Sequence, residues 1–106
     1  MVLRTIVVDG EVAGNVVSWK EAAGRRLVGY WVGREFWGHG IATAALALFL
    51  NQVTERPLHA YVATSNVGSI RVLEKCGFRR LPMDAQAPAS NARDGIEEAV
   101  LALEAP

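Results

Sequence analysis

The sequence predicts one α/β domain, in which helices pack in a layer against a mixed, mostly antiparallel sheet. Three observations support this fold class. Short β-branched runs separated by turn residues fill the first third of the chain, a long apolar helical stretch follows, and a second helix is flanked by further strands. The expected order is βββ-α-β-α-ββ. No internal repeat or composition break divides residues 1–106, so we expect a single domain.

The composition is that of an ordinary globular protein, with 51% hydrophobic and 21% charged residues in 106. Eleven Lys and Arg balance eleven Asp and Glu, which argues against nucleic acid as a partner. The lone cysteine, Cys76, excludes an internal disulfide and a cysteine-rich zinc site, and we expect no metal. The longest apolar run, Ile41–Leu50, is much shorter than the ~20 residues of a membrane helix. With no signal peptide at the start, we expect a cytoplasmic protein without a membrane partner.

The first three expected strands are consecutive and antiparallel. Leu3–Val8 and Glu11–Trp19 flank Asp9-Gly10, a pair typical of the two positive-φ positions in a hairpin turn. A polar turn, Lys20–Arg26, leads to a third strand over Arg26–Val32. The alternation of this strand places two sets of side chains on opposite faces, namely Val28, Tyr30 and Val32 against Leu27 and Trp31.

The first helix is expected over Ile41–Glu55, with Pro57 preventing its continuation. Its first three turns are apolar on almost every face. A helix of this kind is usually buried on more than one side, so we expect it to lie across the sheet with something else over it.

The second helix is expected over Val67–Cys76 and follows the good N-cap residues Thr64, Ser65 and Asn66. Gly77 occupies the position of a left-handed residue after the helix end, and Phe78 can then fold back on Leu73.

Three further strands complete the expected sheet. Leu58–Ala63 connects the two helices, Phe78–Leu81 follows the second, and Gly95–Glu104 is the last. Between these last two, Pro82–Asp94 is small, polar and interrupted by proline, so we expect a mobile loop.

One segment indicates chemistry: a strand, then a glycine-rich turn with Gly38 and Gly40, then the start of a helix at Ile41. Such a turn lets several N–H groups point at one spot in front of the positive helix end, which is an arrangement suited to pyrophosphate. On spacing alone, an ordinary turn is an equally good interpretation. The segment is neither a Walker loop nor a complete dinucleotide fingerprint.

Two motifs resemble those of the GNAT superfamily of acetyltransferases. Trp37-Gly38-His39-Gly40-Ile41-Ala42 is similar to motif A, Gln/Arg-x-x-Gly-x-Gly/Ala, and tryptophan at its first position is common in the RimJ/RimL-like branch. Residues Asn66–Phe78 are similar to motif B, Asn-x-x-Ser-x-x-x-x-Glu-Lys-x-Gly-Phe. The resemblance spans roughly Val2–Glu104.

The resemblance implies a site for acetyl-CoA as co-substrate. The strand ending at Val32 would splay from Leu58–Ala63, and the Trp31 and Val32 backbones and Asn66 would contact the pantetheine arm. The pyrophosphate would lie on the amides of Gly38, His39, Gly40, Ile41 and Ala42, with Trp37 packed beneath them. Arg71 would belong to a basic rim for the CoA phosphates, together with Arg34, His39 and Lys75.

The implied activity is transfer of an acetyl group to a primary amine, on a protein N-terminus or a small molecule, by direct attack on the thioester. Many family members protonate the departing thiolate with a motif-B tyrosine, but that position is Leu73 here. Ser69 is therefore the candidate acid. The general base is undetermined, with Glu35, His59 and Tyr61 as candidates.

The chain departs from the family pattern at its start. It begins at what would be the second strand, without the usual first strand and two helices, which normally form much of the acceptor wall. A catalytically silent CoA-binding or protein-interaction module is therefore the alternative to an enzyme. Leu3–Val8 would also be an edge strand with one arginine and no proline, which favours a homodimer.

Overall fold

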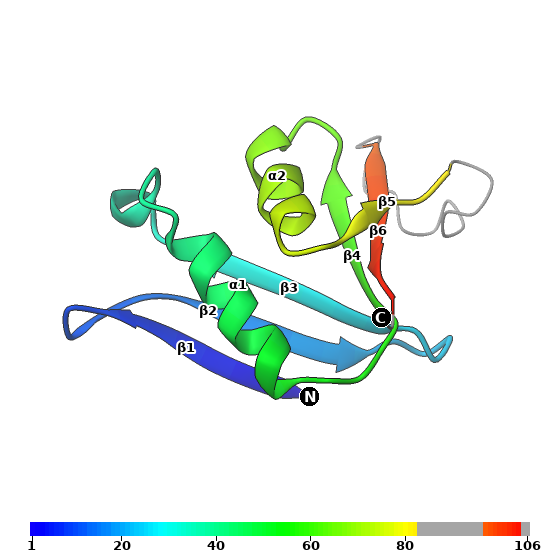
Figure 1. Cartoon of the computed structure of the whole chain (residues 1–106), viewed down its shortest axis with the longest axis horizontal. Coiled ribbons are helices and arrows are strands. Elements are labelled where there is room, and N and C mark those ends of the chain that lie inside the picture. The colour runs from blue at the N-terminus through cyan, green and yellow to red at the C-terminus, as the bar shows by residue number, and fades with distance from the viewer. Residues whose placement is uncertain (83–96, 105–106) are drawn as a thin grey trace.

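The computed structural model describes residues 1–82 and 97–104, and within them two helices pack on one six-stranded sheet. This confirms the mixed α/β class and the order of the elements, to which the structure adds a short 3-10 helix. The elements are β1 (Val2–Val8), β2 (Glu11–Lys20), β3 (Arg26–Val32), the 3-10 helix η1 (Arg34–Phe36), α1 (Ile41–Gln52), β4 (Leu58–Ala63), α2 (Val67–Lys75), β5 (Arg79–Arg80) and β6 (Glu98–Leu103) (Figure 1). Neither described helix has the length and hydropathy needed to cross a membrane.

The strands are ordered β1-β2-β3-β4-β6-β5, and all neighbours are antiparallel except β3 and β4. The β1–β2 hairpin turns as predicted, because Asp9 (φ 48°) and Gly10 (φ 82°) both have positive φ. On β3 the alternation is also as predicted. Val28 and Val32 are buried in the core, while Trp31 lies on the other face and is 62% exposed.

The sheet opens between its two parallel strands. β3 and β4 share one register pair, Leu27 with His59, whereas β4 and β6 pair along their whole length. Figure 1 shows β3 and β4 diverging from that point. The splay that the sequence resemblance implied is therefore present.

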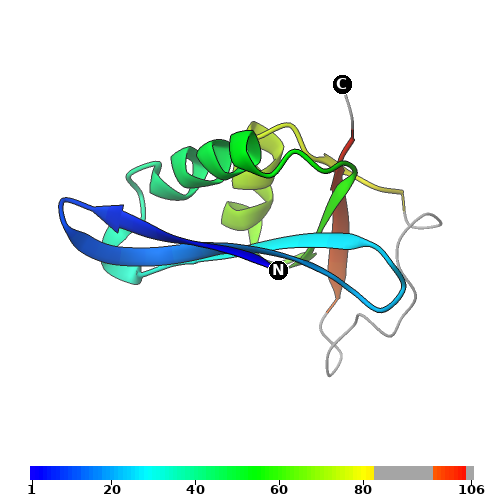
Figure 2. The same cartoon turned by 90° about the horizontal axis from the view of Figure 1, so that it is seen from below.

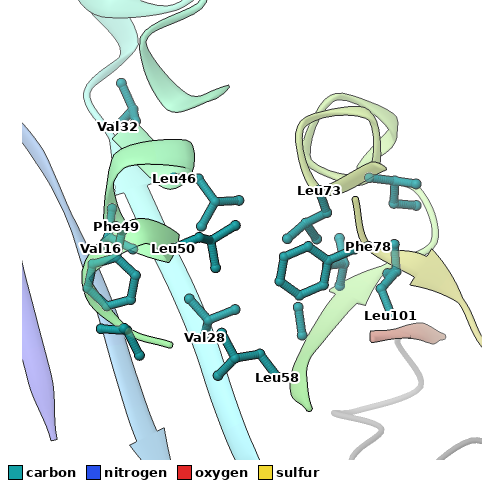
Figure 3. Close-up of a cluster of buried hydrophobic side chains, with 14 of the residues drawn as sticks. Val16, Val28, Val32, Leu46, Phe49, Leu50, Leu58, Leu73, Phe78 and Leu101 are labelled. Carbon is teal, nitrogen blue, oxygen red and sulfur yellow. The ribbon is translucent and has the colours of Figure 1, made fainter. Parts of the chain in front are cut away.

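Both helices lie on the same side of β1–β3, and Figure 2 shows the opposite face of these strands without a covering helix among the described residues. The core follows this layering (Figure 3). Leu46, Phe49 and Leu50 of α1 pack in one cluster with Val16 and Val28 of the sheet. Leu73 of α2 and Phe78 belong to the same cluster, at its other end.

The prediction that the first helix is buried on more than one side is wrong. Only Leu46, Phe49 and Leu50 of α1 are buried, and Leu48 is 66% exposed. The exposed residues of α1 are Ala44, Ala47, Leu48, Asn51 and Gln52, and two alanines and one leucine among polar residues carry too little apolar area to require a second covering layer.

The first helix also ends earlier than predicted, at Gln52 rather than Glu55. Val53 is already extended, with φ −104° and ψ 99°. The Arg56 guanidinium donates hydrogen bonds to the carbonyls of Leu50, Val53 and Glu55, and so satisfies groups that the helix end leaves free.

The second helix ends at Lys75 with Cys76 as its C-cap, and the expected glycine stop is confirmed. Gly77 has φ 99°, its N–H bonds the Glu74 carbonyl at 3.0 Å, and the Phe78 N–H bonds the Leu73 carbonyl at 3.0 Å. Because Phe78 belongs to this cap, β5 is shorter than the predicted strand.

The last predicted segments are only partly described. The predicted loop Pro82–Asp94 lies outside the described residues from residue 83 onward. The predicted last strand, Gly95–Glu104, is described from residue 97, and β6 begins at Glu98.

Candidate active site

A cavity of about 640 Å³ lies where β3 diverges from β4. One wall is the end of β3 with the glycine-rich loop and the start of α1, and the facing wall is α2. The lining comprises Tyr30, Trp31, Val32, Phe36, Trp37, Gly38, Gly40, Ile41, Ala42, Thr43, Asn66, Gly68, Ser69, Arg71, Val72 and Lys75. The cavity thus brings together Ser69 and the residues predicted to contact CoA, except His39 and Arg34, which are exposed and outside the lining.

The glycine-rich loop has the backbone conformation that its sequence indicates. Gly38 (φ 80°) and Gly40 (φ 72°) both have positive φ, and a Cβ at either position would meet nothing within 4 Å. Gly40 is the N-cap of α1 and provides no side-chain hydrogen bond to the first turn. Within the described residues, the first N–H groups of α1 therefore remain available at the positive end of the helix, beside the cavity.

Trp37 connects this loop to the end of β3 through a hydrogen bond. Its indole Nε1 donates to the Val32 carbonyl at 2.7 Å, and the Arg34 guanidinium lies over its ring, 5.5 Å from the centroid. Of the Val32 backbone, which is predicted to contact the pantetheine arm, the carbonyl thus already accepts one hydrogen bond. Trp37 is 60% exposed, so it borders the cavity as well as supporting the loop.

On the facing wall, Asn66 caps α2. Its Oδ1 accepts a hydrogen bond from the Ser69 N–H at 3.1 Å. Capping is therefore the role that the structure shows for Asn66, and the Ser69 hydroxyl is left for another partner. Arg71 and Lys75 follow on the same helix and add positive charge to this wall.

The hydrogen-bond partner of the Ser69 hydroxyl is Tyr30, which sequence reasoning did not select. The Tyr30 hydroxyl lies 2.7 Å from Ser69 Oγ and 3.2 Å from the Ser69 carbonyl oxygen. Burial raises the pKa of Tyr30 above 10.0, although the Ser69 hydrogen bond opposes this, so the phenol stays protonated at neutral pH. One signal was available: a phenol on the core-facing side of a strand needs a hydrogen-bond partner.

The candidate bases Glu35, His59 and Tyr61 do not line the cavity. The Tyr61 hydroxyl donates to Glu21 Oε1 at 3.1 Å and accepts from Arg25 Nη1 at 3.3 Å, away from the cavity lining. Burial, reinforced by the charge of Arg25, lowers the pKa of His59 below 6.5.

Leu73 and Cys76 pack in or against the hydrophobic core. Leu73, at the position where many family members carry tyrosine, is 1% exposed and part of the core. Cys76 is partly buried against the core, and burial raises the pKa of its thiol, which fits a small apolar residue rather than a nucleophile.

Sequence comparison identifies the family. Residues 5–79 match the family described as "Acetyltransferase (GNAT) domain", so the chain belongs to the GNAT acetyltransferases. No curated protein matches it.

Solved structures agree on the fold. RimJ of Mycobacterium smegmatis, in complex with CoA-disulfide, is 30% identical with a TM-score of 0.75, over 93% of this chain and 50% of RimJ. YncA of Salmonella typhimurium, with acetyl-CoA, is 17% identical with a TM-score of 0.79, over 96% of this chain and 63% of YncA. A GNAT-family acetyltransferase from Bacillus anthracis is 20% identical with a TM-score of 0.70, over 91% of this chain and 60% of that protein. The chain thus spans less than two thirds of the length of each.

Proposed function

We propose that this chain is an acetyl-CoA-dependent N-acetyltransferase acting on a primary amine. One observation carries the proposal: the two segments that resemble GNAT motifs face each other across one cavity. The Gly38–Ala42 loop forms one wall, and α2, with Ser69 and Arg71, forms the other. Bound CoA in solved members of the fold, including RimJ and YncA, supports this assignment of the cavity.

The cavity fits a phosphate-bearing, elongated ligand. Uncapped N–H groups at the start of α1 suit the pyrophosphate, and the open space beside Gly40 lets a phosphate approach the backbone. Arg71 and Lys75 supply positive charge on the opposite wall. The pantetheine arm would then run between β3 and α2 toward Tyr30 and Ser69, which also line the cavity.

The reaction we propose needs no covalent enzyme intermediate. The neutral amine nitrogen attacks the acetyl carbonyl carbon, a C–N bond forms and the C–S bond breaks. The nitrogen releases one proton to water, the thiolate sulfur receives one from the Ser69 hydroxyl, and Ser69 regains one from water. A thiol with a pKa of about 8.5 is a tolerable leaving group, so the acid contributes rate without being indispensable.

The acceptor is proposed only as a class. The tryptophan at position 37 is common in the RimJ/RimL-like branch, and RimJ is 30% identical to this chain. Another neighbour, at 19% identity and a TM-score of 0.75, is RimL, named a ribosomal L7/L12 alpha-N-protein acetyltransferase, which favours the amino group of a protein N-terminus over a small-molecule amine. A cytoplasmic location stays a prediction.

Thiol release from acetyl-CoA, measured with a panel of N-terminal peptides and small amines, tests the proposal. We expect turnover with at least one peptide and CoA binding by calorimetry. Ser69→Ala should lower kcat by ~10²-fold or more with CoA affinity unchanged. Binding without turnover on any amine would instead favour the CoA-binding module, and absence of binding would refute both.

We also propose that the chain forms a homodimer through the β1 side of the sheet. β1 is an edge strand in the described sheet, and Leu3 and Val7 on it are 52% and 59% exposed. Leu3→Lys with Val7→Lys should convert the dimer to a monomer by light scattering at micromolar concentration. Leu48→Lys is the matched control, because Leu48 is equally apolar and exposed but lies on α1. A monomeric unmodified protein would contradict the proposal.

A further inference from the structure

We propose that Tyr30 is a positioning residue for Ser69: its phenol donates to Ser69 Oγ and leaves the serine proton free for the departing thiolate. The proposal rests on the function proposed above and deepens it. It starts from one contact across the cavity, the 2.7 Å between the Tyr30 hydroxyl and Ser69 Oγ, which joins β3 to α2. That distance is typical of a well-formed O–H···O hydrogen bond.

Ser69 needs such a partner if it is to serve as an acid. A serine hydroxyl rotates freely and, on a helix, commonly turns back to a carbonyl of the preceding turn. No such bond is made here, and Tyr30 is the only hydrogen-bond partner of Ser69 Oγ within the described part of the chain. The Ser69 N–H is held by Asn66 Oδ1, so the backbone of this turn is fixed and only the hydroxyl remains to be oriented.

Two proton arrangements are compatible with the distances. In one, Tyr30 donates to the Ser69 carbonyl oxygen at 3.2 Å and Ser69 donates to the phenol oxygen, which turns the serine proton away from a ligand. In the other, Tyr30 donates to Ser69 Oγ and the serine proton is free. A developing thiolate favours the second arrangement, because the negative sulfur attracts the serine proton. As that proton leaves, Ser69 Oγ becomes more negative and is stabilised by the hydrogen bond that Tyr30 donates to it.

Tyr30 is suited to remain the donor throughout the reaction. Half-buried against the core, it carries its proton well beyond neutral pH, so the contact does not depend on pH in the working range. Tyr30 gives up no proton in this scheme: one proton moves from Ser69 to sulfur, and Ser69 recovers one from solvent.

The kinetic test compares Tyr30→Phe with Tyr61→Phe. Both remove one phenol hydroxyl, but the Tyr61 hydroxyl bonds Glu21 and Arg25 away from the cavity lining, so this control should keep the unmodified kcat. We expect Tyr30→Phe to lower kcat by ~10-fold or more, the size of effect that misplaced catalytic groups produce, with the KM for acetyl-CoA changed less than about twofold. In a Ser69→Ala background, Tyr30→Phe should cost nothing further.

A merely structural role predicts a different pattern. If Tyr30 only holds β3 against α2, its loss would raise KM or lower stability while kcat is kept, or would cost the same factor with and without Ser69. Either result overturns the proposal.

A second measurement needs no turnover, so it separates this inference from the proposed function. The chain has two tyrosines, and Tyr61→Phe leaves Tyr30 as the only one. With isotope-labelled tyrosine in that variant, the NMR signal of Tyr30 Cζ should shift on adding CoA, shift less with desulfo-CoA, and lose the difference in Ser69→Ala. An equal response to both ligands, or none, overturns the proposal whether or not acetyl transfer is found.

Discussion

Gly40 provides the sharpest test of the phosphate cradle, by which we mean the backbone amides of Gly38–Ala42 that are proposed to bind the pyrophosphate. A matched control separates its left-handed backbone conformation from the open space that it leaves for a phosphate. A Cβ at Gly40 would project into open space beside the cavity, and the positive φ of 72° is unfavourable for any L-residue. Gly24, in the turn between β2 and β3, also has positive φ (93°) and open space around its Cβ, but lies outside this cavity. Gly40→Ala and Gly24→Ala therefore introduce comparable backbone strain, and only one of them places a methyl group at the cradle.

The expected costs follow from these geometries. Forcing alanine into a left-handed conformation costs ~1–2 kcal/mol, which lowers the Tm of a domain of this size by ~4–8 °C for each kcal/mol. Both variants should show this loss by thermal unfolding. In calorimetry, Gly40→Ala should weaken CoA binding ~10-fold, or about 1.4 kcal/mol, while Gly24→Ala binds as the unmodified protein does. Equal CoA affinity for the two variants would refute the cradle.

Two further predictions concern stability. Gly77→Ala should cost ~1–3 kcal/mol in urea unfolding, because φ is 99° and the new Cβ would lie 3.2 Å from Leu103 Cδ1; a loss below a few tenths of a kcal/mol would contradict the cap. The pKa of His59 is lowered in the folded state by burial and Arg25, so the unfolded state binds its proton more readily. The stability associated with neutral His59 should be complete above pH 6.5 and fall as the pH decreases below it. His59→Gln should therefore lose less free energy of unfolding between neutral and acidic pH than the unmodified protein does.

The elements that sequence could predict are those decided by local chemistry. Asp9-Gly10 and Gly77 adopt positive φ where their types and spacing require it, and the turn and the helix end follow from that. The conformation of the glycine-rich loop was predictable for the same reason, since Gly38 and Gly40 adopt positive φ directly before the start of a helix. In each case the decisive interaction spans only a few residues.

The Tyr30–Ser69 contact could not be predicted, because its partners are 39 residues apart and meet only once the sheet opens. Alternation places Tyr30 on the core-facing side of β3 but cannot say which polar group it reaches. The one-sided burial of α1 escaped prediction for a related reason. Counting apolar residues around a helix treats alanine like leucine, whereas the area they bury decides whether a second layer is needed.

The opening of the sheet leaves backbone groups of β3 beside the cavity without their ladder partners. β3 pairs with β2 along its length but with β4 only at Leu27, so the β3 backbone groups directed toward β4 lose their ladder partners beyond that point. The Val32 carbonyl finds a substitute in the Trp37 indole. Backbone groups left without partners beside a cavity are matched best by an extended chain with its own N–H and C=O groups, as when a peptide adds a strand to a sheet. The pantetheine arm of the proposed co-substrate is such a chain, and under that proposal the break that separates Tyr30 from β4 would provide the edge along which the arm lies.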